Sequence, residues 1–219
     1  MTYDEFAEIF YQELDQICLY FERNANRLEK LTEDNINFQV CGQLIGRGYN
    51  ATHDENNKGH SDITIKYLNF IWIGEGKKLT SANNSYLLKG YDQLKDRYTI
   101  GKSGSDKAAL LAYVYAPDSA HVMAEWKQHL TSLSASNPAY KGAMSPCPSQ
   151  PNHAFYSEFP HPSSGRPCRV RHVAFSLHLV HAKKSKSAKT IEAPLEFKTP
   201  KIAKTSKGVK AALTKTANH

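Results

Sequence analysis

The sequence predicts an α/β domain with a mixed central sheet flanked by helices. Three observations support this class. Apolar residues recur at helical spacing near the N-terminus, short apolar strands follow, and helices and strands then alternate along the chain. With 219 residues, 40 % of them hydrophobic, the chain is long enough for one full core and too short for two large ones. We therefore expect one folded domain over residues 1–181.

The first half of the chain contains the clearest helix signal. Thr2 and Glu5 form a capping box, so a long amphipathic helix should begin at once and continue to about Leu31. Residues 36–44 are expected to be extended, and the polar, glycine- and asparagine-rich residues 46–58 indicate a loop or hairpin turn. Two short strands rich in isoleucine and aromatic residues are then predicted at 62–67 and 70–75.

In the second half, helices and strands are predicted to alternate. Residues 81–85 can cap a second helix with Leu87, Leu88, Tyr91, Leu94 and Tyr98 on its buried face, and Pro117 and Asp118 open a third that ends near Leu133. The remaining expectations are a turn at 101–104, a doubly covered strand at 109–115, an irregular segment at 134–167 and a last strand at 169–180. The predicted order is α-β-β-β-α-β-α-β.

The net charge of +7 is concentrated at the C-terminus. Residues 183–219 contain ten lysines and only Glu192 and Glu196, so the rest of the chain, with 18 basic and 19 acidic residues, is close to neutral. We expect residues 182–219 to form a lysine-rich tail. Lysines gain affinity for a polyanion by displacing counterions from phosphates, so DNA or RNA is one expected partner of this tail. A solubilising extension is the alternative.

Localisation is predicted from what the sequence lacks. No apolar run is long enough to cross a bilayer, and the acidic start of the chain differs from a secretory signal. The four cysteines show no paired spacing. We therefore expect no membrane association and reduced thiols in the cytoplasm.

Three charged residues lie at the edges of the two apolar strands. Glu75 and Lys77 are two residues apart, so their side chains share one face of an extended chain, and Asp62 opens the preceding strand. Two carboxylates bind a hard cation such as Mg²⁺ through oxygen, with Mn²⁺ as a possible substitute. A neighbouring lysine can orient or deprotonate the attacking water and offset charge that develops on a phosphate. Ordinary loop-edge charges that form a surface ion pair are the alternative.

In its strand-strand-helix context, Asp62 followed by Glu75-x-Lys77 resembles the PD-(D/E)XK superfamily of restriction-endonuclease-like nucleases. The resemblance covers residues 2–115 and also includes the order of the elements. It departs from the family pattern at Ser61, where the family has proline, and at the glycines on both sides of Glu75. The resemblance implies a restriction-endonuclease-like fold, with Asp62 and Glu75 as metal ligands and Lys77 as the third catalytic group.

Two further residues are predicted to assist this site. Families of this kind often add a glutamate from the first helix, and Glu13, at the border of the buried stripe, is the candidate ahead of Glu8. A solvated helix-flank glutamate is the alternative. Many members also carry a glutamine on the helix after the site, and Gln93 is placed there, with Lys89 as its i,i+4 neighbour.

The sequence thus predicts a Mg²⁺-dependent phosphodiesterase. The resemblance implies a DNA endonuclease in bacterial antiviral defence or DNA processing, restrained by a regulatory or targeting protein or by homo-oligomerisation. Two alternatives stay open, since the metal chemistry does not distinguish DNA from RNA. One is an RNase. The other is an inactive nuclease-like module that binds nucleic acid or protein, and the glycines around Glu75 keep this alternative open.

Overall fold

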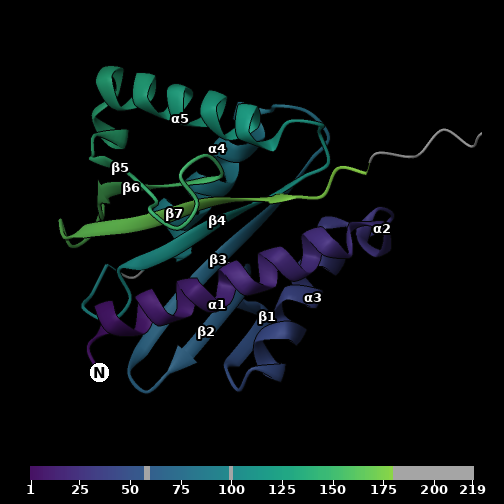
Figure 1. Ribbon diagram of the computed structural model, residues 1–219. Helices are drawn as coiled ribbons and strands as arrows, with labels where there is room; N and C mark the ends of the chain where they lie inside the picture. Colours follow the sequence, from purple (N-terminus) through teal and green to yellow (C-terminus); the bar gives the residue numbers. More distant parts are fainter. Residues whose placement is uncertain (57–59, 99–100, 180–219) are drawn as a thin grey trace, which may run out of the picture. The chain divides into compact units, whose positions relative to one another are not determined.

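The computed structural model describes residues 1–56, 60–98 and 101–179. These residues form a seven-stranded mixed sheet with helices on both faces, which confirms the α/β class (Figure 1). The predicted basic tail, residues 182–219, lies outside the described residues. The elements are α1 (Tyr3–Arg23), α2 (Ala25–Leu28), α3 (Glu33–Gly46), β1 (Asn50–Asn56), β2 (His60–Tyr67), β3 (Phe70–Leu79), α4 (Asn84–Gln93), a π-helical turn (Leu94–Tyr98), β4 (Lys107–Val114), α5 (Ser119–Ser136), a 3₁₀ turn (Pro138–Tyr140), β5 (Met144–Pro146), β6 (Ala154–Pro160) and β7 (Pro167–Ser176).

The strand order in the sheet is β1-β2-β3-β4-β7-β6-β5. The three central strands β3, β4 and β7 are parallel, while the pairs β1–β2, β2–β3, β7–β6 and β6–β5 are antiparallel. Parallel strands need crossover connections, and α4 joins β3 to β4 while α5 opens the connection from β4 to β7. The carboxyl ends of β3, β4 and β7 consequently lie at the same edge of the sheet.

The first helix begins as predicted but is shorter. Both hydrogen bonds of the Thr2–Glu5 capping box are present. The helix ends at Arg23 instead of near Leu31, because Asn24 leaves the helical conformation (φ −115°, ψ 22°) and its side-chain amide donates to the carbonyl of Tyr20. The short helix α2 follows. One long helix was therefore a wrong prediction for residues 24–31.

Residues 36–44, predicted to be extended, form the body of helix α3. Thr32 caps this helix, since its hydroxyl accepts the backbone N–H of Asn35. Ile36, Val40 and Leu44 recur every four residues and are fully buried. The prediction of an extended segment was wrong, because the four-residue spacing of these residues is that of a helix packed against a sheet.

Two predicted irregular segments contain strands. β1 lies within residues 46–58, and β5 and β6 lie within residues 134–167. β1 has few apolar residues because it is an edge strand, with a neighbour on one side only. β6 ends at Pro160 and lies within a segment rich in proline and serine, so its surroundings resembled a loop.

The other elements agree with the sequence prediction. β2, β3, α4, β4, α5 and β7 all occur where strands and helices were expected, with β3 extended to Leu79 and α5 to Ser136. The last strand, predicted over residues 169–180, ends earlier, at Ser176. β4 is almost entirely buried, as expected for an apolar strand in the middle of a sheet with helices on both faces.

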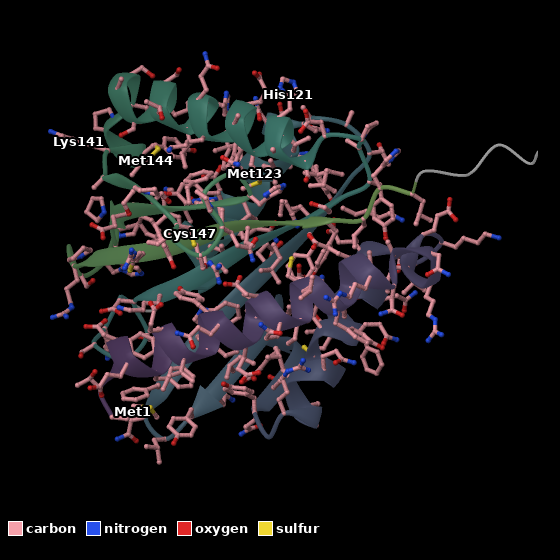
Figure 2. The ribbon with its side chains drawn as sticks, viewed as in Figure 1. Met1, His121, Met123, Lys141, Met144 and Cys147 are labelled. Atoms are coloured by element: carbon pink, nitrogen blue, oxygen red, sulfur yellow. The ribbon has the colours of Figure 1, made fainter. Side chains whose placement is uncertain are left out.

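Two apolar layers hold the sheet between its helices. The layer under α1 and α3 contains Phe10 and Trp72, and the layer under α4 and α5 contains Leu110 and Trp126. Figure 1 shows the two pairs of helices on opposite faces. In Figure 2, the side chain of Met123 points from α5 toward the sheet, and its 3 % exposure fits this position. Within the described ranges, no helix has the length and apolar character needed to span a membrane.

Candidate functional site

The site lies where strands β2 and β3 separate. Their pairing runs from Tyr67 opposite Phe70 to Ile63 opposite Gly74 and ends there. β3 continues to Leu79 with β4 as its partner. Asp62 is the next residue on β2 and Glu75 the next on β3, so the two acids meet at the point of separation.

Glu75 and Lys77 project from the face of β3 that α4 covers. They alternate with the glycines and share this face with Ile73 and Leu79, which belong to the apolar layer under α4. The Lys77 ammonium donates to Glu75 Oε1 at 2.6 Å, and the two residues are only 5 % and 1 % exposed. Gly90 makes room for the lysine, since a Cβ there would lie 2.9 Å from Lys77 Cε.

Carboxylates replace β2 as hydrogen-bond partners of β3 beyond the separation. The backbone N–H of Gly76 donates to Asp62 Oδ2 at 2.8 Å, and that of Lys78 donates to Glu33 Oε2 at 2.6 Å. Strand N–H groups point in the plane of the sheet toward the neighbouring strand. Asp62 therefore lies in that plane, between the two faces.

Glu33, the first residue of α3, is a member of the site that the sequence reasoning missed. Its carboxylate accepts the hydroxyl of Tyr86 at 2.8 and 3.0 Å and the Lys77 ammonium at 3.4 Å. The Tyr86 ring also lies 5.3 Å from the Lys77 nitrogen. The helix cap at Thr32 would have placed Glu33 in a first helical turn, but the extended assignment of residues 36–44 concealed it.

The glycines beside Glu75 have a packing role. A Cβ at Gly76 would lie 2.1 Å from Asn37 Oδ1 and 2.8 Å from the Tyr113 ring, and one at Gly74 would lie 2.9 Å from the Trp72 ring. The Tyr113 hydroxyl donates to the same Asn37 oxygen at 2.7 Å, which fixes the pair in place. Glycines therefore stand beside Glu75, where the PD-(D/E)XK pattern more often has bulky apolar residues, because Trp72, Asn37 and Tyr113 fill the space on the α3 side of the strand.

Burial and crowding of charge shift the pKa values of the acids upward. Burial, with repulsion from Asp62, raises the pKa of Glu75 to about 8 despite the attraction of Lys77. Burial also raises the pKa of Asp62, although the Gly76 N–H and Lys77 oppose the shift. Burial disfavours the charged form of Lys77, but Glu75, Glu33 and Asp62 outweigh it and raise the lysine pKa. Lys77 is therefore a cation at neutral pH, whereas the ion-free site favours the protonated, neutral form of Glu75.

Glu75 has one oxygen available for a cation. Oε1 accepts from Lys77, while Oε2 is buried and has no hydrogen-bond partner among the described residues. Asp62 and Glu33 add oxygen donors of the kind that Mg²⁺ and Mn²⁺ bind. In residues 1–56, 60–98 and 101–179, no three His, Cys, Asp or Glu side chains already form a metal-binding group. Asp62 and Glu33 are instead bonded to the N–H groups of Gly76 and Lys78, so their carboxylates do not converge on one point. Carboxylate oxygens are nonetheless the ligands that a hard divalent ion prefers.

The structure does not bring Glu13 to this site. Its carboxylate pairs with Arg47 at 3.1 Å, and its side chain is 40 % exposed. Gln93 is the last residue of α4, three residues after Gly90, and it lines a surface depression with Lys89, Asp92 and Asp96. None of the three central residues lines that depression. The helix glutamate that contacts Lys77 is Glu33, and Gln93 lines a depression that does not include the three central residues.

Comparisons with protein-family models, with curated proteins and with solved structures found no match. The candidate site is accordingly defined by its geometry and chemistry. It consists of the half-buried Asp62 and the buried Glu75–Lys77 ion pair, which lie where the pairing of β2 with β3 ends, and of Glu33 at the start of α3.

Proposed function

We propose that this chain is a metal-dependent nuclease of the restriction-endonuclease-like, PD-(D/E)XK class, which hydrolyses phosphodiester bonds in DNA. The observation that carries the proposal is the state of Glu75. Its carboxylate is buried next to a second acid, with Lys77 on one oxygen and no partner among the described residues on the other. A structural ion pair would satisfy both oxygens, whereas a metal ligand needs one of them free.

The residues that would hold the ion are Asp62 and Glu75. Glu33, whose carboxylate contacts the same lysine as Glu75, is a further candidate ligand. When bound, Mg²⁺ or Mn²⁺ would lower the pKa of a coordinated water and neutralise charge on the phosphate. The protein's own part is to hold the acids at the end of the β2–β3 pairing. Beyond that point Asp62 and Glu33 take the hydrogen-bonding places that β2 leaves along β3.

Lys77 would act as a fixed positive charge. Its raised pKa keeps the ammonium protonated at neutral pH, so the structure favours the charge-stabilising role over that of a general base. The contacts with Glu75 and Glu33 hold the nitrogen in place on the α4 face. A preorganised cation is worth most in a site from which water is excluded, and Lys77 is only 5 % exposed.

The packing role of the glycines weakens the alternative of an inactive binding module. Gly74 and Gly76 accommodate Trp72 and Asn37, so they are compatible with an intact site. The biological setting follows from the resemblance alone. We propose bacterial antiviral defence or DNA processing, with restraint by a regulatory or targeting partner or by self-association.

The test is incubation of the purified protein with plasmid, linear DNA and RNA in Mg²⁺, Mn²⁺ or EDTA. Glu75→Ala and Lys77→Ala should each abolish cleavage with the fold intact. Lys66→Ala is the matched control, because this lysine of β2 forms a surface pair with Glu55. Cleavage of RNA alone would indicate the RNase alternative. Folded protein that binds nucleic acid without cutting it under any of these conditions would refute the nuclease proposal.

A further inference from the structure

Lys78 follows Lys77 on β3 but faces the other side of the sheet, because successive residues of a strand alternate. Lys77 lies on the α4 face, where its ammonium contacts Glu75. The Lys78 ammonium lies on the α3 face, 4.5 Å from the centre of the Tyr115 ring, and the residue is half-buried. An ammonium in such a position needs hydrogen-bond acceptors.

The acceptors are backbone carbonyls of the turn between α2 and α3. The Lys78 ammonium donates to the carbonyl of Leu31 at 2.6 Å and to that of Glu29 at 3.3 Å. The Tyr115 hydroxyl donates to the carbonyl of Leu28, the last residue of α2, at 2.8 Å. The last carbonyls of a helix have no partner inside the helix, and a lysine can supply one. Lys78 and Tyr115 therefore hold this turn against the end of the sheet.

The turn that Lys78 holds leads directly to Glu33. Thr32 caps α3, and Glu33 is the first residue of that helix. The Glu33 carboxylate accepts the backbone N–H of Lys78 at 2.6 Å and contacts the Lys77 ammonium at 3.4 Å. Lys78 thus binds residues 29–33 at two points, with its ammonium at the turn and its N–H at the carboxylate. A carboxylate keeps its place in a site only when the backbone that carries it is held.

We propose that Lys78 is a positioning residue of the candidate site, whose ammonium fixes the α2–α3 turn so that the Glu33 carboxylate lies beside Lys77. This role rests on the proposed function, because it gives Glu33 a part in the reaction. Lys78 acts through Glu33, so its loss should cost no more activity than the loss of the Glu33 carboxylate. An anchor that serves only the fold would lower stability and leave cleavage by the folded protein unchanged.

A double-mutant cycle of plasmid cleavage in Mg²⁺ tests this role. Lys78→Met keeps the apolar stem and removes the charge, and it should slow cleavage at least fivefold but no more than Glu33→Gln does. The double variant should cleave as fast as Glu33→Gln alone. Lys107→Met is the matched control, because Lys107 also lies over a tyrosine ring but at the opposite end of the parallel strands. Wild-type cleavage by folded Lys78→Met, or losses that multiply in the double variant, would overturn the proposal.

Amide hydrogen exchange in EDTA tests the placement of Glu33 without any cleavage. The N–H at position 78, which Glu33 accepts, is retained in Lys78→Met. Its protection factor should fall at least tenfold relative to that of Leu111, in the centre of the sheet, while Lys107→Met leaves it unchanged. Unchanged protection in Lys78→Met would overturn the proposal. A wild type that neither cleaves nor binds Mg²⁺ would refute the nuclease proposal, whereas a loss of protection at position 78 would still show that Lys78 positions Glu33.

Discussion

Replacement of Glu75 by glutamine should change how the stability of the metal-free protein depends on pH. The pKa of Glu75 is raised from its usual 4.5 to about 8, so the folded state holds this proton more tightly than the unfolded state. Between these two values the folded state binds more protons, and the unfolding free energy of the wild type therefore falls as pH rises. Glutamine has no proton to lose, so the variant lacks this decline.

The size of the effect follows from the shift. Each pKa unit corresponds to about 1.4 kcal/mol, so the wild type should lose about 3 to 5 kcal/mol relative to Glu75→Gln between pH 4.5 and pH 8.5. Because the burial is almost complete, with 1 % exposure, solvent screening reduces the figure little. The attraction of Lys77 for the ionised carboxylate is already included in this pKa shift, and the lysine itself stays protonated over the whole range.

Urea unfolding in EDTA measures this difference. Trp72 and Trp126 are fully buried, one in each apolar layer, so tryptophan fluorescence reports on both sides of the sheet. The unfolding free energies of the wild type and the variant should diverge as pH rises. Mg²⁺ at a hundredfold excess over its dissociation constant should then restore about 3 kcal/mol to the wild type alone. Parallel pH profiles in EDTA would show that Glu75 does not occupy the crowded, buried environment described above.

Three further changes test other parts of the structure. Gly76→Ala should destabilise the fold by about 1–3 kcal/mol, because its Cβ would overlap Asn37; thermal or urea unfolding measures this, and an unchanged midpoint would contradict the tight approach. Glu33→Gln should reduce cleavage at least tenfold, while Glu13→Gln, which affects only a surface pair, should leave it unchanged; equal rates for both would remove Glu33 from the site. A chain truncated after His181 should bind duplex DNA more weakly and with a shallower salt dependence, since the tail carries ten of the chain's 28 basic residues. Identical salt slopes in titrations of the two chains would assign the lysines to solubility or to a protein partner.

Strong local patterns made much of the fold predictable. The Thr2–Glu5 capping box, the apolar run of β4 and the cap at Asp118 each specify one element without help from distant parts of the chain. Helix α3 was missed although Ile36, Val40 and Leu44 recur at the four-residue spacing of a helix. The edge strands β1 and β5 were missed because strands with one neighbour need few apolar residues.

The central part of the site was predictable because it depends on two adjacent strands. Glu75 and Lys77 share a face by strand periodicity, and Asp62 reaches them through one hairpin. Glu33 could not be placed in the same way. Its contact with Lys77 spans 44 residues and depends on how α3 packs against the sheet, which no local pattern contains. The partner of Glu13 in the structure, Arg47, is likewise 34 residues away in the sequence.

Asp62 on β2 and Glu33 at the start of α3 also act as a substitute strand. Asp62 and Glu33 hold the N–H groups of Gly76 and Lys78, as the carbonyls of a neighbouring strand would. An ion that recruits both carboxylates must compete for these bonds, so occupancy of the site and order in β3 are linked. Amide hydrogen exchange at Gly76 and Lys78 should therefore report ion binding directly, even in a variant that cannot cleave.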